Sequence, residues 1–514
     1  MASASAAPRA SLLVALATPP AVVEQLAFER LREAPSSGPI AGDLAISPLL
    51  PYIAAPYVAA PRVAVAPPAT DFDIAAELVT EEQRGFAQAL DRWIAQSQGA
   101  VRRARRKAIA RAYASLGYRP LWRGAAQWRA SAVSALERLQ RAAEDGLDLR
   151  GYVLPGLAAE PSVADDLALS EAVVAYADQA AGARVDPRRV SRLIGARLVL
   201  PEPSAVLAAT AAAGAGAGDA LRSHNPDHAG YRALRAKLAE LRSARLPEAR
   251  RYAESRAVTS DANDRQAAPA APRKRADARL EAEIIANMER WRWLPRELGD
   301  DRIEVNIPDF ELAVIRDGAV THRARVIVGK EGTPTPVFSD AMQFIIVNPY
   351  WNVPPSILAK EMLPKHGGSL QSIAASGYEV IYQNGQARVR QRPGEGNALG
   401  RIKFMFPNDF SVYLHDTPSR GLFSAAHRAF SHGCVRVEEP FRLAEAVLGP
   451  NSGWREERVR KLIGGSERYI NLARPLPIHI EYFTAYVDAR GRLQLRGDLY
   501  GYSAKVRAAL GLDG

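Results

Sequence analysis

Between residues 76 and 245, apolar positions recur with the period of an α-helix. The clearest run places Phe86, Leu90, Trp93 and Ile94 on one helical face, behind a capping pattern of Thr80 and Gln83. Further stretches with this period are 101–116, 128–146 and 165–182. We therefore expect a helical domain over 76–245, with Trp93, Trp122 and Trp128 packed in its core.

From about residue 300 the period changes to two, which indicates β-strands. The expected strands are 303–306, 312–316, 323–328, 343–347, 402–406, 412–415 and 478–483. Asp317-Gly318 predicts a tight hairpin turn, and one helix is expected over 438–448. Short strands with turn signals predict a mostly-β, sandwich-like domain rather than alternating β/α units. The expected fold class is therefore α+β multidomain, with a helical scaffold domain followed by a mostly-β domain.

Four stretches break these patterns. Residues 1–75 are rich in Ala and Pro, which predicts an irregular N-terminal segment. Residues 246–277 lose the apolar face and predict a linker. Residues 354–400 interrupt the expected domain over 278–484 with a glycine-containing insertion, which is typical of a capping lid. The remainder, 485–514, is a C-terminal extension.

The charge balance narrows the classes of partner. The net charge is +11 and the pI about 9.7, so nucleic acid, anionic lipid and a carboxylate-rich cell wall would all attract the chain. The sharpest basic run, 102–107, is interpreted as a solvated helix face, and no nucleic-acid-binding motif accompanies it. The sequence has no run of 18 apolar residues and no evident signal peptide. We expect no nucleic-acid partner and no integral membrane segment.

Cys434 is the only cysteine of the chain. It allows no intramolecular disulfide and no Cys-rich zinc site, and we expect neither a metal nor another cofactor. A lone cysteine is either a small buried residue or a nucleophile. Three of the eight histidines, His415, His427 and His432, lie shortly before it. Because a thiol reacts as thiolate and needs a base nearby, this concentration favours the nucleophile.

The spacing alone leaves two histidines open as the base. His432 lies two residues before Cys434, so in extended backbone both side chains point to one face. His415 lies at the end of an expected strand and could reach Cys434 through the fold. Gly433, between His432 and Cys434, allows close approach of substrate to backbone N–H groups that could bind an oxyanion.

The segment Ser431-His-Gly-Cys-Val-Arg436, preceded by His415, resembles the signature of the YkuD-type L,D-transpeptidase family. The resemblance covers roughly 300–484 and implies that Cys434 is the nucleophile and His415 its base. It further implies a main-chain carbonyl at Asp416 that holds the other ring nitrogen, and oxyanion donors at the Gly433 and Cys434 amides. It implies substrate-binding or ordering roles for Tyr413, Ser431, His432 and Arg436.

A wider resemblance links Tyr118-Arg-Pro-Leu-Trp122, Asn348–Pro354 and the insertion to the YcbB-like subgroup, which has a scaffold domain and a lid. It implies that Tyr350, Trp351 and Asn352 line the substrate groove. The chain departs from that subgroup, because the place of its peptidoglycan-binding module holds only a short polar segment. The type of cross-link, 3–3 or 1–3, therefore stays open.

The family implies a two-step acyl transfer between peptidoglycan stem peptides through a cysteine thioester. If water takes the place of the acceptor amine, the product is that of an L,D-carboxypeptidase; a protein-to-peptidoglycan ligase would use the same motif. A non-catalytic cell-wall scaffold is the alternative of another class, although such a protein needs no activated thiol. We expect a monomer in the periplasm of a Gram-negative bacterium, a location inferred from the substrate.

Overall fold

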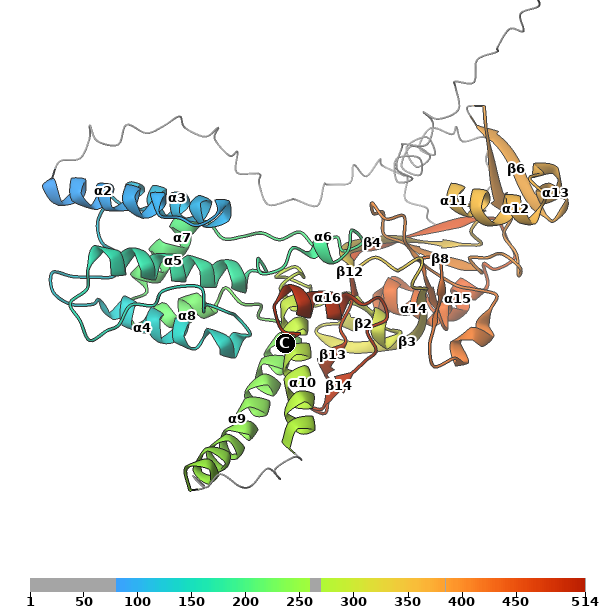
Figure 1. The fold of residues 1–514 in the computed structure, drawn as a ribbon. Coiled ribbons are helices and arrows are strands. Elements are labelled where there is room, and N and C mark those ends of the chain that lie inside the picture. Colours follow the sequence, from blue (N-terminus) through green and yellow to red (C-terminus); the bar gives the residue numbers. More distant parts are fainter. Residues whose placement is uncertain (1–79, 259–269, 384, 514) are drawn as a thin grey trace, which may run out of the picture.

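The computed structural model describes residues 80–258, 270–383 and 385–513. Along the chain they form a helical domain, a pair of long antiparallel helices and a β domain that carries a small lid (Figure 1). The expected fold class, a helical region followed by a mostly-β domain, is confirmed. The irregular segment expected over 1–75 lies outside the described residues. In the part of the chain that is described, no helix has the length and apolarity needed to cross a bilayer.

The helical domain packs several helices around a continuous apolar core that includes the fully buried Trp122. Its helical elements are α2 (Glu81–Ala95), α3 (Ala100–Ser115), α4 (Ala130–Gln140), η2 (Ala142–Asp145), α5 (Val163–Ala180), α7 (Pro203–Ala212), η3 (Gly214–Gly216) and α8 (Ala217–Arg222). The short α6 (Pro187–Val190) lies between α5 and α7 along the chain, but its Val190 belongs to the core of the β domain. The predicted capping box of Thr80 and Gln83 is present at the start of α2. Trp93 and Trp128 are partly buried against the same core.

The basic run 102–107 is less solvated than the sequence predicts. Arg102 and Arg106 both bind Glu171 of α5, at 2.6 and 3.0 Å. Arg105 binds Asp178, seven residues further along α5, at 3.1 Å. The interpretation as a solvated face was wrong for these three arginines, because α5 presents carboxylates seven residues apart along the same face. Much of the positive charge of this run is thus neutralised within the domain.

The segment 118–122 is anchored on α5 by one buried carboxylate. Asp166 accepts hydrogen bonds from the backbone N–H groups of Leu121 and Trp122, at 3.2 and 2.8 Å, and from the Tyr113 hydroxyl at 2.5 Å. A buried carboxylate needs hydrogen-bond donors such as these, so the segment 118–122 has a structural role: it joins a loop to the core of the helical domain.

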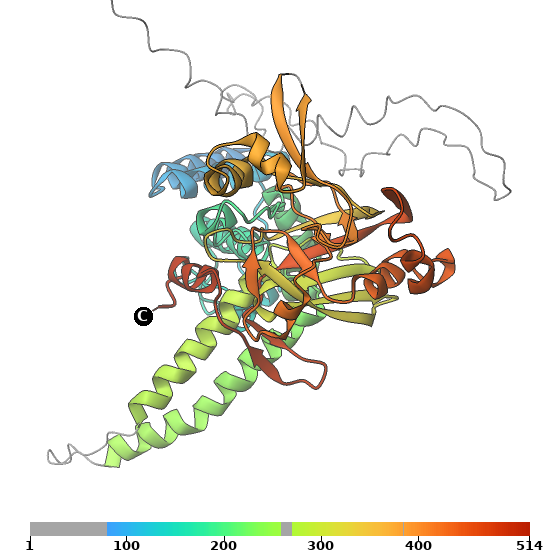
Figure 2. The ribbon, with the colours of Figure 1, turned by 90° about the vertical axis from the view of Figure 1, so that its right-hand side faces the viewer.

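The predicted linker 246–277 is helical wherever it is described. α9 (Ala229–Val258) and α10 (Ala270–Trp291) run side by side and project away from both domains (Figures 1 and 2). The sequence predicted a linker here, whereas the described parts are helical, because the lack of an apolar face does not prevent a helix. Ala, Arg and Glu have high helix propensity, so the helices continue beyond the apolar pattern.

The β domain is a ring of strands that closes on itself. Its strands are β1 (Arg302–Asn306), β2 (Glu311–Arg316), β3 (Ala319–Gly329), β4 (Phe338–Val347), β8 (Ile402–Met405), β9 (Leu414–His415), β10 (Ala429–Ser431), β11 (Val435–Val437) and β12 (Arg468–Glu481). The neighbours run β2, β3, β11, β9, β8, β4, β12, β1 and back to β2, with β10 on the edge of β3. Asp317 and Gly318 both have positive φ in the β2–β3 turn, as the predicted hairpin requires.

Three shorter segments complete the β domain. The helices α14 (Pro440–Leu448) and α15 (Glu456–Arg460) follow β11, in agreement with the helix expected over 438–448. The C-terminal segment adds the hairpin β13 (Ala485–Val487) and β14 (Leu493–Leu495), and helix α16 (Tyr502–Ala509). It packs back onto the ring, because the Tyr500 hydroxyl donates to the Gly329 carbonyl at 2.6 Å at the end of β3.

The insertion expected as a lid folds as a separate small layer. It contains β5 (Trp351–Asn352), α11 (Pro355–Ile357), η5 (Leu358–Met362), α12 (Leu363–Lys365), α13 (Leu370–Ala375), β6 (Tyr378–Gln383) and β7 (Gln386–Gln391). The three strands form their own sheet in the order β5-β7-β6, over a core of Val353, Met362, Ile373 and Val389. The layer stands out from the ring (Figure 2).

Candidate functional site

Two neighbouring strands bring Cys434 and His415 together. β9 and β11 are parallel, with Leu414 opposite Val435 and His415 opposite Arg436. Leu414 and Val435 are fully buried in the core of the ring. Because side chains alternate along a strand, His415 and Arg436 point to the outer face. Cys434 directly precedes β11 and lies two positions before Arg436, so the same alternation puts its side chain on this face, level with Tyr413 and two residues before the His415 position.

Two more side chains of this outer face border His415. Lys403 of β8 is the pairing partner of His415, and its ammonium lies 3.6 Å from the centre of the Tyr413 ring. The Tyr413 ring meets the His415 ring edge to face at 5.7 Å. Arg436 is partly buried; burial lowers the pKa of its guanidinium, while the charge of Cys434 raises it. On this face the His415 imidazole therefore lies between the Lys403 ammonium and the Arg436 guanidinium, and the Cys434 thiol shares the face with them.

His415 is held as a neutral ring. It is 5% exposed, and burial followed by the charge of Arg436 lowers its pKa to about 3. Its Nδ1 lies 2.5 Å from the carbonyl oxygen of Asp416. A carbonyl can only accept, so Nδ1 carries the proton and Nε2 of the neutral ring is left with a lone pair. This contact is the one that the family resemblance implies between His415 and the Asp416 carbonyl.

The Ser431 hydroxyl closes the turn that precedes the thiol. It donates to the Cys434 carbonyl oxygen at 2.5 Å and accepts from the Gly433 N–H at 3.1 Å. Gly433 has a φ of +117°, which L side chains rarely adopt. Its carbonyl accepts from the fully buried Thr335 hydroxyl at 2.8 Å. Thr335 is a positioning residue that the sequence did not reveal, because it lies far from the motif along the chain.

The hydrogen bond to Ser431 bears on the expected oxyanion site. The Gly433 N–H is used within the turn, so in this state it would have to be shared between Ser431 and an oxyanion. The assignment of Gly433 and Cys434 amides as oxyanion donors stays a prediction.

The lid reaches this turn through one ion pair. Nε2 of His432 lies 2.8 Å from Oε1 of Glu361 in η5. Both side chains are substantially exposed, at 35% and 50%, so the contact contributes little to stability. It nevertheless joins the lid to the residue two positions before Cys434, and it engages one ring nitrogen of His432.

Comparison with known families agrees with this arrangement. Residues 300–462 match the YkuD family of L,D-transpeptidase catalytic domains, and residues 107–238 match a scaffold-domain family. Residues 300–462 are an L,D-transpeptidase catalytic domain. The recognition made from the sequence is thereby confirmed at the level of these two domains, whereas the YcbB-like subgroup stays a prediction.

One curated relative matches part of the chain. A Haemophilus influenzae protein, named as a candidate L,D-transpeptidase, is 32% identical over 254 residues, which is 45% of this chain. The alignment covers 50% of that protein, so the chain spans about half the length of the curated relative it matches.

Among solved structures, an L,D-transpeptidase from Mycobacterium smegmatis matches 35% of this chain and 58% of its own, at 15% identity and a TM-score of 0.20. The catalytic domain of an Enterococcus faecium L,D-transpeptidase acylated by ertapenem matches 36% of this chain and 98% of its own, at 13% identity and a TM-score of 0.17. Matches at such low TM-scores carry no argument here.

Tyr350, Trp351 and Asn352 lie at the base of the lid of the L,D-transpeptidase domain. Trp351 and Asn352 form β5 and pair with β7 of the lid sheet. The Tyr350 N–H donates to Glu467 at 2.8 Å, and its ring lies 4.3 Å under the guanidinium of Arg390. These contacts join the lid to the ring of strands. A role of the three residues in a substrate groove stays a prediction.

Replacing Gly400 by Ala is expected to damage the candidate site through Asp416. Gly400 has a φ of +63°, and an added Cβ would lie 2.4 Å from the Asp416 carboxylate. Asp416 is 1% exposed and cannot move aside into solvent, so the carbonyl that orients His415 must shift. We expect a loss of stability of roughly 1–3 kcal/mol and lower acylation of Cys434. Gly396→Ala is the matched control, because its added Cβ would meet nothing within 4 Å. Equal melting temperatures and acylation rates in the two variants would contradict the prediction.

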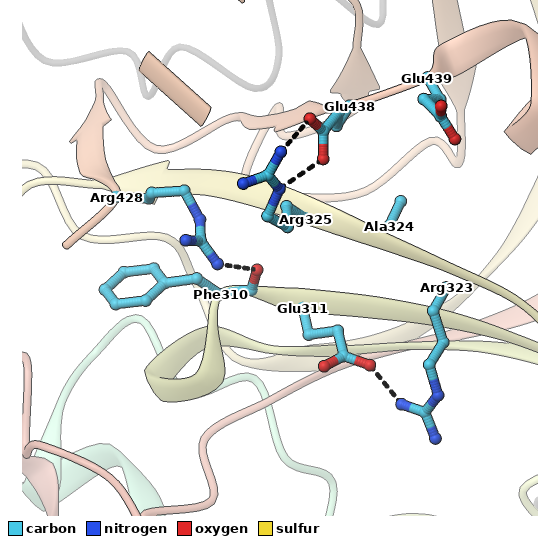
Figure 3. A pocket seen from close by; sticks show the side chains of 8 residues that line it. All are labelled: Phe310, Glu311, Arg323, Ala324, Arg325, Arg428, Glu438 and Glu439. Atoms are coloured by element: carbon cyan, nitrogen blue, oxygen red, sulfur yellow. Dashed lines mark hydrogen bonds and ion pairs between the residues drawn. The ribbon is translucent and has the colours of Figure 1, made fainter. Parts of the chain in front are cut away.

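Two cavities elsewhere in the described structure differ in how their charges are satisfied. The smaller, about 270 Å³, lies over β2 and β3 (Figure 3). Its charged groups bind partners in its wall: Arg325 contacts Glu438 at 2.5 Å, Arg323 contacts Glu311, and Arg428 donates to the Phe310 carbonyl at 3.1 Å. This is a network of ion pairs on the protein surface rather than a ligand site. The larger, about 900 Å³, has neither Cys434 nor His415 in its wall.

Proposed function

We propose that the chain is an L,D-transpeptidase that cross-links peptidoglycan by two-step acyl transfer through a thioester on Cys434. The observation that carries the proposal is that the neighbouring strands β9 and β11 put Cys434 on the same face as a neutral, buried His415 whose Nδ1 is fixed by the Asp416 carbonyl. This supports His415 as the base, because a neutral ring whose Nδ1–H is held by a carbonyl presents the lone pair of Nε2 to a proton. The match of residues 300–462 to the L,D-transpeptidase catalytic domain supports the same chemistry.

The first step is attack by the thiolate on the carbonyl carbon of the L,D bond in the donor stem peptide. His415 Nε2 takes the thiol proton, and the S–C bond forms while the carbonyl oxygen becomes an oxyanion. The imidazolium then gives the proton to the leaving amine as the C–N bond breaks. A thioester remains on Cys434.

The electrostatics suit a resting pair without charge. Lys403 and Arg436 oppose protonation of His415 as long as Cys434 holds its proton. When the thiolate forms, its negative charge lies beside the new imidazolium and stabilises it. The charges therefore favour proton transfer at the moment of attack over a permanent ion pair.

The second step is attack on the thioester by an amine of the acceptor stem: the C–N bond forms, the C–S bond breaks, and His415 takes the amine proton and returns it to the Cys434 sulfur. Arg436 is partly buried, and its Nε has no hydrogen-bond partner, which suits a contact to a substrate carboxylate or carbonyl. Glu361 of the lid lies next to the nucleophile turn, where a closed lid would exclude water. Tyr413, Ser431 and His432 complete the proposed site.

The proposal extends to the domain division, the cellular location and the type of cross-link. We propose a division into a scaffold domain over 76–245 and a catalytic domain over 278–484, with 354–400 as lid. The place of action would be outside the cytoplasm, in the periplasm of a Gram-negative cell. The cross-link would be of the 3–3 or the 1–3 type.

Mass spectrometry of muropeptides tests the proposal. Purified sacculi are incubated with the protein or its Cys434→Ala variant and then digested. New dimers from the wild type alone are expected, and their fragmentation gives the bond type. Shortened stems without dimers would assign an L,D-carboxypeptidase instead. No change in either sample, with both proteins folded, would leave the non-catalytic wall scaffold as the better reading.

A further inference from the structure

The loop 330–335, between β3 and β4, holds the turn before the thiol by two backbone carbonyls of that turn. The Thr333 hydroxyl donates to the Ser431 carbonyl at 3.1 Å, and the Thr335 hydroxyl donates to the Gly433 carbonyl at 2.8 Å. The backbone of the turn is therefore fixed by a segment that lies outside the sequence motif.

The second of these contacts sets the direction of the next backbone amide. The Gly433–Cys434 peptide bond is trans, so its carbonyl and its N–H point in opposite directions. The carbonyl points to Thr335, which is fully buried, and the Cys434 N–H is therefore directed away from that buried side. This is an amide that the family resemblance implies as an oxyanion donor. Such a donor acts only when it is aimed at the place where the charge develops.

Tyr500 fixes Thr335 in turn. The Tyr500 hydroxyl accepts from the Thr335 N–H at 3.2 Å and donates to the Gly329 carbonyl at 2.6 Å. The Gly329 N–H donates to the Thr335 hydroxyl oxygen at 2.8 Å, so the proton of that hydroxyl is directed to the Gly433 carbonyl. The Tyr500 hydroxyl thus joins the end of β3 to the residue that holds the turn.

The Tyr500 side chain is itself held in place. Its backbone N–H donates to the Tyr482 hydroxyl at 2.7 Å, and the two rings stack with their centres 5.7 Å apart. Burial raises the pKa of Tyr500 to about 12, so its hydroxyl keeps the proton that it donates to Gly329. A group that is fixed by its own neighbours can orient another group precisely.

We propose that Tyr500 is a positioning residue for the acylation of Cys434: it fixes Thr335, and Thr335 aims the Cys434 N–H at the oxyanion. This inference rests on the proposed function of the chain. Tyr500 acts through Thr335 and not by contact with the substrate. It belongs to the C-terminal extension, beyond residue 462, where the match to the catalytic-domain family ends. The extension is thereby part of the catalytic unit.

The first test replaces Tyr500 by Phe in the full chain, which keeps the ring and its stacking and removes the hydroxyl. We expect the rate constant of carbapenem acylation at saturation to fall by at least about tenfold, because a small displacement of a catalytic group costs up to about 10²-fold in rate. The concentration for half-saturation should not change. Tyr502→Phe is the matched control, because this neighbouring hydroxyl bonds to Ser191 at 3.0 Å instead. Stopped-flow absorbance of ring opening measures both constants.

Alkylation by iodoacetamide separates a misaimed amide from a general loss of structure. The Cys434 thiolate displaces iodide from a saturated carbon, so the S–C bond forms and the C–I bond breaks without an oxyanion. Cys434 is the only cysteine, so the gain in mass reports a single sulfur. Tyr500→Phe should therefore be alkylated at the wild-type rate although it is acylated slowly.

Variants of Thr335 test the route by which Tyr500 acts. Thr335→Val removes the hydroxyl at nearly the same size and should be acylated at least as slowly as Tyr500→Phe. Thr335→Ser keeps the hydroxyl and should recover most of the rate. The double variant Tyr500→Phe/Thr335→Val should be no slower than Thr335→Val alone, because both changes act through the same Gly433 carbonyl.

Four results would overturn the inference. They are acylation of Tyr500→Phe at the wild-type rate, an equal loss in Tyr502→Phe, a parallel loss of alkylation, and additive effects of the Tyr500 and Thr335 changes. A wild type that is alkylated but never acylated would instead overturn the proposed function, and this inference with it.

Discussion

A Cys434→Ala protein is expected to gain no mass when it is incubated with a carbapenem, whereas the wild type gains the mass of one antibiotic molecule. A carbapenem offers an acyl carbon to the thiolate, and opening of its ring leaves a stable thioester on the nucleophile. Cys434 is the only cysteine of the chain, so the adduct has a single candidate sulfur. Removing an enzyme nucleophile lowers the rate by roughly 10⁶-fold, which is below detection in this assay. Intact-protein mass spectrometry measures the outcome.

The interpretation requires that the variant is folded. Cys434 is only partly buried, so removal of its sulfur should change the melting temperature little. Arg428→Lys, which lies at the wall of the smaller cavity, is the matched control and should acylate as the wild type does. An adduct on Cys434→Ala would show that another group is the nucleophile and would remove the basis of the proposed mechanism.

The sequence alone predicted Cys434 and His415 as the reacting pair, but it did not predict the groups that surround them. The motif around Cys434 and the isolated His415 could be recognised because the chemistry is encoded in a short segment. Lys403 was missed, because its place beside His415 depends on the register between β8 and β9, and period-two patterning does not give register. The occupied Gly433 N–H was missed for a related reason, since it depends on the rotamer of Ser431.

The fold, too, could be predicted in part from the sequence. Most strands and helices were expected within a few residues, because each buries one apolar face. The helices α9 and α10 were missed where they leave the protein body, since there the apolar pattern ends before the helix does.

The second prediction concerns the pH dependence of acylation. With a pKa of about 3, His415 stays neutral down to about pH 4, so the acylation rate should be nearly constant between pH 7 and pH 5. A histidine with the ordinary pKa of about 6.5 would be about 97% protonated at pH 5, and the rate would fall roughly 30-fold. Stopped-flow absorbance of carbapenem ring opening gives the rate across this range. A 30-fold loss at pH 5 would contradict a neutral resting pair.

Lys403→Gln supplies the matched comparison. Lys403 is one of the charges that lower the His415 pKa, after burial and Arg436, so its removal should raise that pKa and move the loss of activity to higher pH. The stability of the wild type must change with the same group. The folded pKa lies below the unfolded one, so protons bind the unfolded chain more tightly, and stability falls as the pH drops from about 6.5 towards 3. The difference corresponds to up to about 5 kcal/mol. His415→Gln should therefore melt with a weaker dependence on acid pH than the wild type, and parallel curves would show that burial does not hold this ring neutral.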